Sequence, residues 1–226
     1  MTVGQPGGAK RSGLVVCLAV LCASAALLWA GEGDGEQLFF SRRFPKSEPA
    51  YFEVLLLRGG LAMYREAPGE EDPLEFWFSQ QEADEVFALV EKLDGLKRAV
   101  ASDRKVAFTG QKTFRYRNGQ GAAAELSFSF TEDPDARTLE RWFQRAGESV
   151  RYRFELERTA QFDYLGVNKA LLQFQVAFEK DRIVALAQFL PILKKIARQQ
   201  KFLHMARIRA ASLVQRIENE TAGSSQ

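Results

Sequence analysis

The chain has 226 residues, enough to bury a substantial core, and its 46% hydrophobic and 12% aromatic content excludes a wholly disordered protein. Its formal net charge is +2, and two of its basic residues, Lys10 and Arg11, precede the first apolar run. Without residues 1–30 the chain has 29 basic and 29 acidic side chains, so its bulk charge identifies no class of partner.

The N-terminus has the pattern of a secretory signal peptide, predicted over residues 1–30. The two basic residues form its positive region, residues 13–29 form an apolar run, and Ala30 offers a small residue for cleavage. We therefore predict export to the periplasm or out of the cell. The alternative is an inner-membrane anchor over residues 13–30, because a spanning helix needs only about 18 apolar residues. Both cysteines lie in this run, so the mature chain would fold without disulfides.

Residues 31–49 (GEGDGEQLFFSRRFPKSEP) are rich in glycine, charged residues and proline, and predict a flexible tether. Residues 50–133 then alternate between strand-like and helix-like patterns, which indicates a small α+β domain. Turn signals at Gly59-Gly60 and Asn118-Gly119 indicate two hairpins. The predicted strands are residues 51–57, 61–66, 74–78, 112–117 and 123–130.

Two helix starts have clear capping signals. Ser79 and Glu82 match a capping box, and Gly95 is predicted as the C′ residue that ends the helix they begin. Asp133 and Pro134 predict the start of a second helix, because proline at the first helical position has no amide to leave unpaired.

This order of elements predicts an α+β fold: a small antiparallel sheet of about five strands packed with helices. The segments RGGLAMYREA, SQQEADEVFALVEKLDGL, KTFRYRNG…ELSFSF and LERWF lie within residues 50–146. The order of these segments resembles that of the emfourin family of small bacterial domains, which inhibit metalloproteases. The resemblance implies protease inhibition as an alternative function and assigns no inhibitory residue. The whole chain is also similar to bacterial exported proteins.

Residues 134–219 have helical apolar spacing throughout and predict a C-terminal helical hairpin that turns near Asp181, with the last helix over residues 186–218. The alternative is a bundle of shorter helices with a break near Gly166. An unbroken helix of about 45 residues would be about 70 Å long, which is too long for a domain of this size. Residues 220–226 are predicted to form a disordered tail.

The sequence offers little for catalysis or metal binding. His204 is the only histidine, lies at the edge of an apolar stripe, and is predicted to be structural. Zinc sites need three or four nitrogen or sulfur ligands, and the mature chain would offer one histidine and no cysteine, so we predict no metal. We also predict no cofactor and no catalytic residue. Carboxylates at residues 70–72 and 132–133 lie in predicted loops, which leaves a carboxylate-dependent hydrolase as the least favoured alternative.

The last helix carries a basic face. Between Arg182 and Ile217 the sequence has eight basic residues and no acidic one. On one continuous helix, five of them would lie within about 80° of one another, opposite the apolar stripe. These five are Lys194, Arg198, Lys201, Arg209 and Arg216. They are interpreted either as a solvated face or as a binding strip for an anionic partner such as phosphate head groups or envelope polymers.

Together these features predict a non-catalytic exported interaction or structural protein of the cell envelope. Its partner would be a protein or an envelope component, and the binder of anionic envelope components is an alternative function. Nucleic acid is not predicted as a partner, because aromatic residues do not alternate with the basic ones.

Two further predictions concern the helical region. A second apolar stripe on its first helix (Tyr152, Leu156, Val167 and Phe174) predicts a homo-oligomer, unless the helix breaks and buries the stripe. Glu157 and Arg207 are charged residues on otherwise apolar faces. In the predicted hairpin register they face each other, so we predict a structural ion pair that is at least half buried.

Overall fold

The computed structural model describes residue 1, residues 35–102 and residues 104–223. The predicted signal peptide beyond residue 1, and the start of the predicted tether, lie outside the described residues. Their cleavage or anchoring therefore stays a prediction. The strands and helices all belong to one compact unit, Asp34–Gln226.

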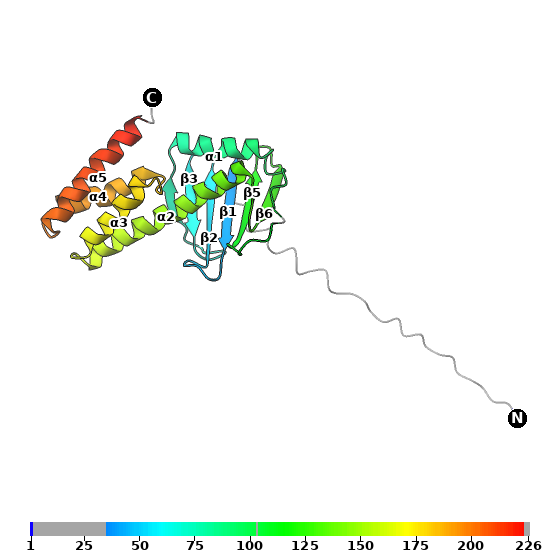
Figure 1. Cartoon of the computed structure of the whole chain (residues 1–226), viewed down its shortest axis with the longest axis horizontal. Helices are drawn as coiled ribbons and strands as arrows, with labels where there is room; N and C mark the ends of the chain where they lie inside the picture. The colour runs from blue at the N-terminus through cyan, green and yellow to red at the C-terminus, as the bar shows by residue number, and fades with distance from the viewer. Residues whose placement is uncertain (2–34, 103, 224–226) are drawn as a thin grey trace. The chain divides into compact units, whose positions relative to one another are not determined.

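The fold is α+β, as the sequence predicts, with six strands where about five were expected (Figure 1). All neighbouring strands are antiparallel, in the order β4-β3-β2-β1-β5-β6. The strands are β1 Gln37–Arg43, β2 Tyr51–Leu57, β3 Leu61–Arg65, β4 Leu74–Trp77, β5 Gln111–Arg117 and β6 Ala123–Phe128. The helices are α1 Gln80–Lys92, α2 Pro134–Phe162, α3 Val167–Glu179, the short 3₁₀ helix η2 Leu186–Phe189, α4 Leu190–Arg198 and α5 His204–Gly223.

The additional strand is β1, and the prediction of a tether is wrong over Gln37–Arg43. β1 pairs along its whole length with β2 on one side and with β5 on the other, so it is a central strand. Leu38 and Phe40 are fully buried on the face that the helices cover. A segment that fills the middle of the core in this way cannot be flexible, and the apolar run 38–40 outweighs the charged and glycine-rich residues around it.

The main core lies between one face of the sheet and the helices α1 and α2. Phe40 stands at its centre, with ring centroids 4.8 Å from Phe114 of β5 and 5.0 Å from Phe143 of α2. Phe87 contributes from α1. Because inward-facing residues alternate along each strand, the same face of the sheet is apolar across neighbouring strands.

The capping box of α1 is confirmed. The hydroxyl of Ser79 accepts from the amide of Glu82, and the carboxylate of Glu82 accepts from the amide of Ser79 at 2.7 Å. The predicted end of the helix is displaced by one residue. Leu93 is the C-cap, Asp94 takes the C′ position with φ 55°, and Gly95 follows it with φ 65°.

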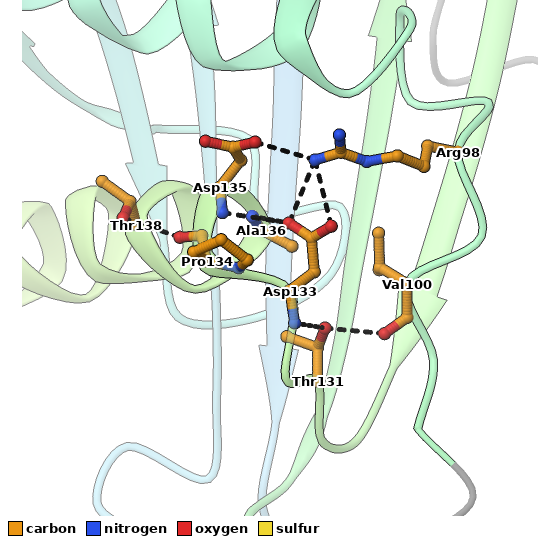
Figure 2. Close-up of polar contacts among 8 residues, drawn as sticks. All are labelled: Arg98, Val100, Thr131, Asp133, Pro134, Asp135, Ala136 and Thr138. Atoms are coloured by element: carbon orange, nitrogen blue, oxygen red, sulfur yellow. Dashed lines mark hydrogen bonds and ion pairs between the residues drawn. The ribbon is translucent and has the colours of Figure 1, made fainter.

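The start of α2 is also confirmed, and Figure 2 shows how it is fixed. Asp133 caps the helix, accepting from the amides of Asp135 and Ala136 at 2.9 Å each. The guanidinium of Arg98 bridges the two carboxylates, 3.0 Å from Asp133 and 2.8 Å from Asp135. The hydroxyl of Thr131 accepts from the amide of Asp133. Carboxylates at a helix N-terminus are favourable, because the helix dipole is positive there.

The C-terminal region is the bundle of shorter helices that the sequence left as the alternative to a hairpin. α2 ends at Phe162, and α3 begins after Gly166, so the break falls near the expected glycine. The predicted last helix over residues 186–218 is wrong as one element. It is divided into η2, α4 and α5, and Pro191 lies in the first turn of α4. The predicted tail is also shorter, because α5 extends to Gly223.

α2 belongs to two cores, so the predicted domain boundary at residue 133 does not separate two packing units. Its first half, from Ala136 to Val150, packs in the core of the sheet. Its second half contributes Leu156 and Ala160 to a second core, which it shares with α3, η2, α4 and α5. Val184 and Ala185, from the connection that follows α3, return to the core of the sheet.

Candidate functional site

Two connections meet at the end of the helical region that lies away from the sheet (Figure 1). One joins α2 to α3 and the other joins α4 to α5. Tyr164 of the first packs edge-on against Phe202 of the second, with ring centroids 6.1 Å apart. The ammonium of Lys201 lies 4.5 Å from the centroid of the Tyr164 ring and donates to the carbonyl of Ala160 at 3.4 Å. We call the surface formed by residues 162–165 and 198–208, together with Lys169, the tip.

The tip exposes large apolar side chains. Single exposed apolar residues are ordinary in proteins, but a group of them on two touching connections and the adjoining helix ends is not. Six such side chains are between 46% and 75% exposed here, namely Phe162, Tyr164, Leu165, Leu203, Met205 and Ile208. The end of α2, the two connections and the start of α5 therefore carry these exposed apolar side chains at one end of the helical region.

Basic side chains accompany this apolar surface. The tip contains four basic residues and one acidic residue. Lys169, Arg198 and Lys201 are at least partly exposed. The one acid, Asp163, accepts a hydrogen bond from the amide of Gly166 at 2.9 Å and so helps to form the turn between α2 and α3. The tip is thus both apolar and positively charged.

The structure divides the predicted basic strip, because its five residues do not lie on one continuous helix. Arg198 and Lys201 belong to the tip. The other three bind within the helical region. Lys194 pairs with Glu218 at 2.7 Å, and Arg216 pairs with Glu179 at 2.9 Å. Arg209 donates to the side chains of Gln175 and Asn168 of α3.

The predicted ion pair between Glu157 and Arg207 is wrong. Glu157 is exposed and pairs with Arg153, one turn earlier on α2, at 3.0 Å. Arg207 donates to Gln200 at 2.8 Å and to the carbonyl of Ala197. The expected register assumed two unbroken helices, and the breaks on both sides of the hairpin remove it.

The second apolar stripe is buried inside the protein. Leu156, Val167 and Phe174 are fully buried in the second core, because α3 folds back after the break. This stripe therefore gives no support to self-association. Tyr164 and Leu165, which lie in the predicted helical region, are exposed instead and belong to the tip. His204 is exposed at the start of α5.

A cleft of about 770 Å³ lies between the connection from β3 to β4 and the middle of α2. Several carboxylates line it, and their hydrogen bonds are structural. Glu66 accepts from the hydroxyl of Tyr64 at 2.8 Å, and Glu148 accepts two hydrogen bonds from Arg182, at 2.9 and 2.6 Å. Burial raises the pKa of Tyr64 well above its ordinary value, and the neighbouring Glu66 raises it further. We assign no catalytic role to this cleft.

Within residues 35–102 and 104–223, no group of three or more histidine, cysteine, aspartate or glutamate side chains could hold a metal ion. Over the same residues, no helix is both long enough and apolar enough to cross a membrane.

The fold and the tip define the protein as an α+β protein with an exposed apolar and basic surface. No family model, no curated protein and no solved structure matches the chain. The resemblance to emfourin domains therefore stays a prediction.

Proposed function

We propose that this protein is a non-catalytic exported protein of the cell envelope that binds the surface of an anionic lipid membrane through the tip. The observation that carries the proposal is the combination of six exposed apolar side chains with basic ones on two touching connections and the helix ends beside them. It develops the sequence-based alternative of an anionic partner such as phosphate head groups, and it moves the binding surface from a helix face to a helix end.

The physical chemistry of a membrane surface matches the tip. Apolar side chains such as Phe162 and Leu165 would enter the boundary between head groups and acyl chains. Basic side chains near an anionic surface contribute about 1 kcal/mol each, and long ones keep their charge at the level of the head groups. Neither contribution is large alone, so stable binding requires both, and the tip offers both.

The charge of the tip favours a membrane over a second copy of the chain. In a symmetric dimer the same patch faces itself, so Arg198 and Lys201 would approach the cations of the partner. Such like-charge contacts are costly. An anionic lipid surface would instead place negative charges opposite both side chains.

Flotation with lipid vesicles tests the proposal. The assay uses the chain beginning at Gly31, because residues 13–30 are apolar enough to bind lipid by themselves and all described elements lie beyond Gly31. Vesicles of phosphatidylglycerol and phosphatidylcholine should bind the protein, vesicles of phosphatidylcholine alone should bind it much less, and added salt should weaken the binding.

Paired variants separate the two contributions. Lys169→Gln with Arg198→Gln should weaken binding to anionic vesicles about 30-fold, from the loss of two surface charges. The control, Lys46→Gln with Lys97→Gln, removes the same charge from exposed positions outside the tip and should leave binding unchanged. Leu165→Gln with Met205→Gln should also reduce binding, whereas Trp77→Gln, at a 58% exposed residue of β4, should not.

Equal binding to neutral and anionic vesicles would contradict the proposal. A second contradicting result would combine two observations. The wild type would not bind vesicles, and sedimentation would show a concentration-dependent dimer that Leu165→Gln with Met205→Gln abolishes. That second result would assign the tip to self-association.

A further inference from the structure

Two positively charged side chains are neighbours on the central strands β1 and β5, near the end of both strands. Arg42 of β1 is the cross-strand partner of Lys112 of β5. Both belong to the face that carries Phe40 and Phe114, because side chains alternate along each strand. Lys112 is only 3% exposed. Like charges directly opposite each other on neighbouring strands are destabilising, so this pair needs an explanation.

The Lys112 side chain has hydrogen-bond partners within the protein, whereas the Arg42 side chain has none within residues 35–102 and 104–223. The ammonium of Lys112 donates to the hydroxyl of Thr109 and to the carbonyl of Ser129, both at 2.7 Å, and lies 3.4 Å from Glu140. The guanidinium of Arg42 lies over the ring of Phe44, 5.6 Å from its centroid. Its Nε is buried and has no hydrogen-bond partner among the described residues. No carboxylate or other acceptor in the described part of the chain binds this guanidinium, so its positive charge has no negatively charged partner there.

Both side chains line a pocket of about 470 Å³ at the end of the sheet beside the start of α2. Arg137 of α2 adds a third positive charge to the lining, and Glu140 supplies the one carboxylate. Three positive charges and one negative charge leave an excess of two positive charges. Glu140 is already engaged, since it also accepts from Gln144 at 2.6 Å.

The remaining wall of the pocket is aromatic. Phe44, Phe108 and Phe130 line it, and the rings of Phe44 and Phe108 meet edge-on with centroids 5.9 Å apart. Phe108 is 57% exposed, although it is a large apolar side chain. The volume is within the range of small-molecule sites, which combine apolar walls with a few polar groups that fix the ligand.

We infer that this pocket binds a small phosphate monoester that carries an apolar group. A phosphate monoester has close to two negative charges at neutral pH, which match the excess of two positive charges. Its oxygens would accept from Arg42 and Arg137, since guanidinium groups are usual partners of phosphate in proteins. Lys112, whose donors bind within the protein, would add only its positive charge. The apolar group would lie against the phenylalanines. The site is independent of the tip, so the two proposals stand or fall separately.

Calorimetry with phenyl phosphate tests the inference, with inorganic phosphate and phenol as the two separate parts of the probe. Phenyl phosphate should bind more tightly than either part. Arg42→Gln and Arg137→Gln should each weaken its binding about tenfold or more, the effect of removing a hydrogen bond to a charged group. Arg43→Gln is the control. It removes the same charge from the next residue of β1, which is exposed, and it should change binding less than twofold.

Thermal unfolding without a ligand separates binding from a structural role. Arg42→Gln removes a like charge opposite Lys112, so its Tm should equal or exceed that of the wild type. A lower Tm would assign Arg42 to the fold and overturn the inference. Absence of binding to phenyl phosphate up to about 1 mM in folded protein, or equal binding by both variants and the wild type, would also overturn it.

Discussion

The backbone amide of Ala185 donates a 2.8 Å hydrogen bond to the carboxylate of Glu82. The other oxygen of that carboxylate accepts from the amide of Ser79 and closes the capping box of α1. Ala185 is 1% exposed and has the left-handed φ of 55°. The Glu82 side chain therefore caps α1 and also fixes the connection between α3 and η2.

We expect Glu82→Ala to destabilise the protein by about 2–4 kcal/mol. Loss of a capping interaction costs about 1 kcal/mol, and a buried amide without an acceptor costs about 1–3 kcal/mol more. Urea unfolding measures the change. Glu85→Ala, on the exposed side of the same helix, is the control and should stay within about 0.5 kcal/mol of the wild type. Similar losses in both variants would mean that the link to Ala185 adds nothing.

We expect Phe40→Ala to destabilise the protein by about 3–5 kcal/mol, because it leaves a cavity among the aromatic rings at the centre of the sheet. Phe162→Ala, at a side chain that is 75% exposed, should cost less than about 0.5 kcal/mol. The measurement is the midpoint of chemical unfolding. A small effect of Phe40→Ala would show that β1 is not a structural part of the sheet.

Local signals predicted most of the elements correctly, and long-range pairing explains what they missed. β2 matches its predicted range, and the caps at Ser79 and Asp133 are where the sequence places them, because turns and caps depend on residues a few positions apart. β1 depends on partners such as Phe114, far along the chain, and its flanks look like a linker. The turn over residues 199–203 contains neither glycine nor proline, so nothing local predicts it.

The candidate site was predicted only in part, for the same reason. Arg198 and Lys201 are in the predicted basic set and also in the tip. Phe162 and Leu165 were missed as surface residues, because helical spacing cannot show which apolar residues lie at or beyond the end of a helix. The predicted break near Gly166 was the signal that could have found them.

We expect the effects of Glu157→Gln and Arg207→Met to be additive within about 0.5 kcal/mol in a double-mutant cycle. The structure gives these residues separate partners, Arg153 for the first and Gln200 for the second. Glu157→Gln alone should cost no more than about 0.5 kcal/mol, as is usual for an exposed pair one turn apart. A coupling well above that limit would restore the hairpin register that the structure contradicts.

We expect a loss of stability at alkaline pH that Tyr64→Phe reduces. Burial raises the pKa of Tyr64 above its ordinary value of 10.0, so the folded protein keeps this proton at a pH where the unfolded chain has lost it. The stability linked to Tyr64 is therefore complete below about pH 10 and is lost as the pH rises toward the folded pKa. Urea unfolding at about pH 8 and about pH 11 measures the difference.

Tyr164→Phe is the control for this prediction, because that side chain belongs to the exposed tip. It should lose stability between the two pH values as the wild type does. The same pH dependence in Tyr64→Phe and in the wild type would contradict the assignment to Tyr64.

The packing of Val184 and Ala185 against the sheet has a consequence for synthesis of the chain. The last strand of the sheet ends at Phe128, yet its core is complete only when residue 185 has left the ribosome. At about 5–20 residues per second, this interval of 57 residues lasts about 3–11 s. During that time the sheet cannot reach its final state, and part of its apolar face stays accessible to chaperones and to other nascent chains.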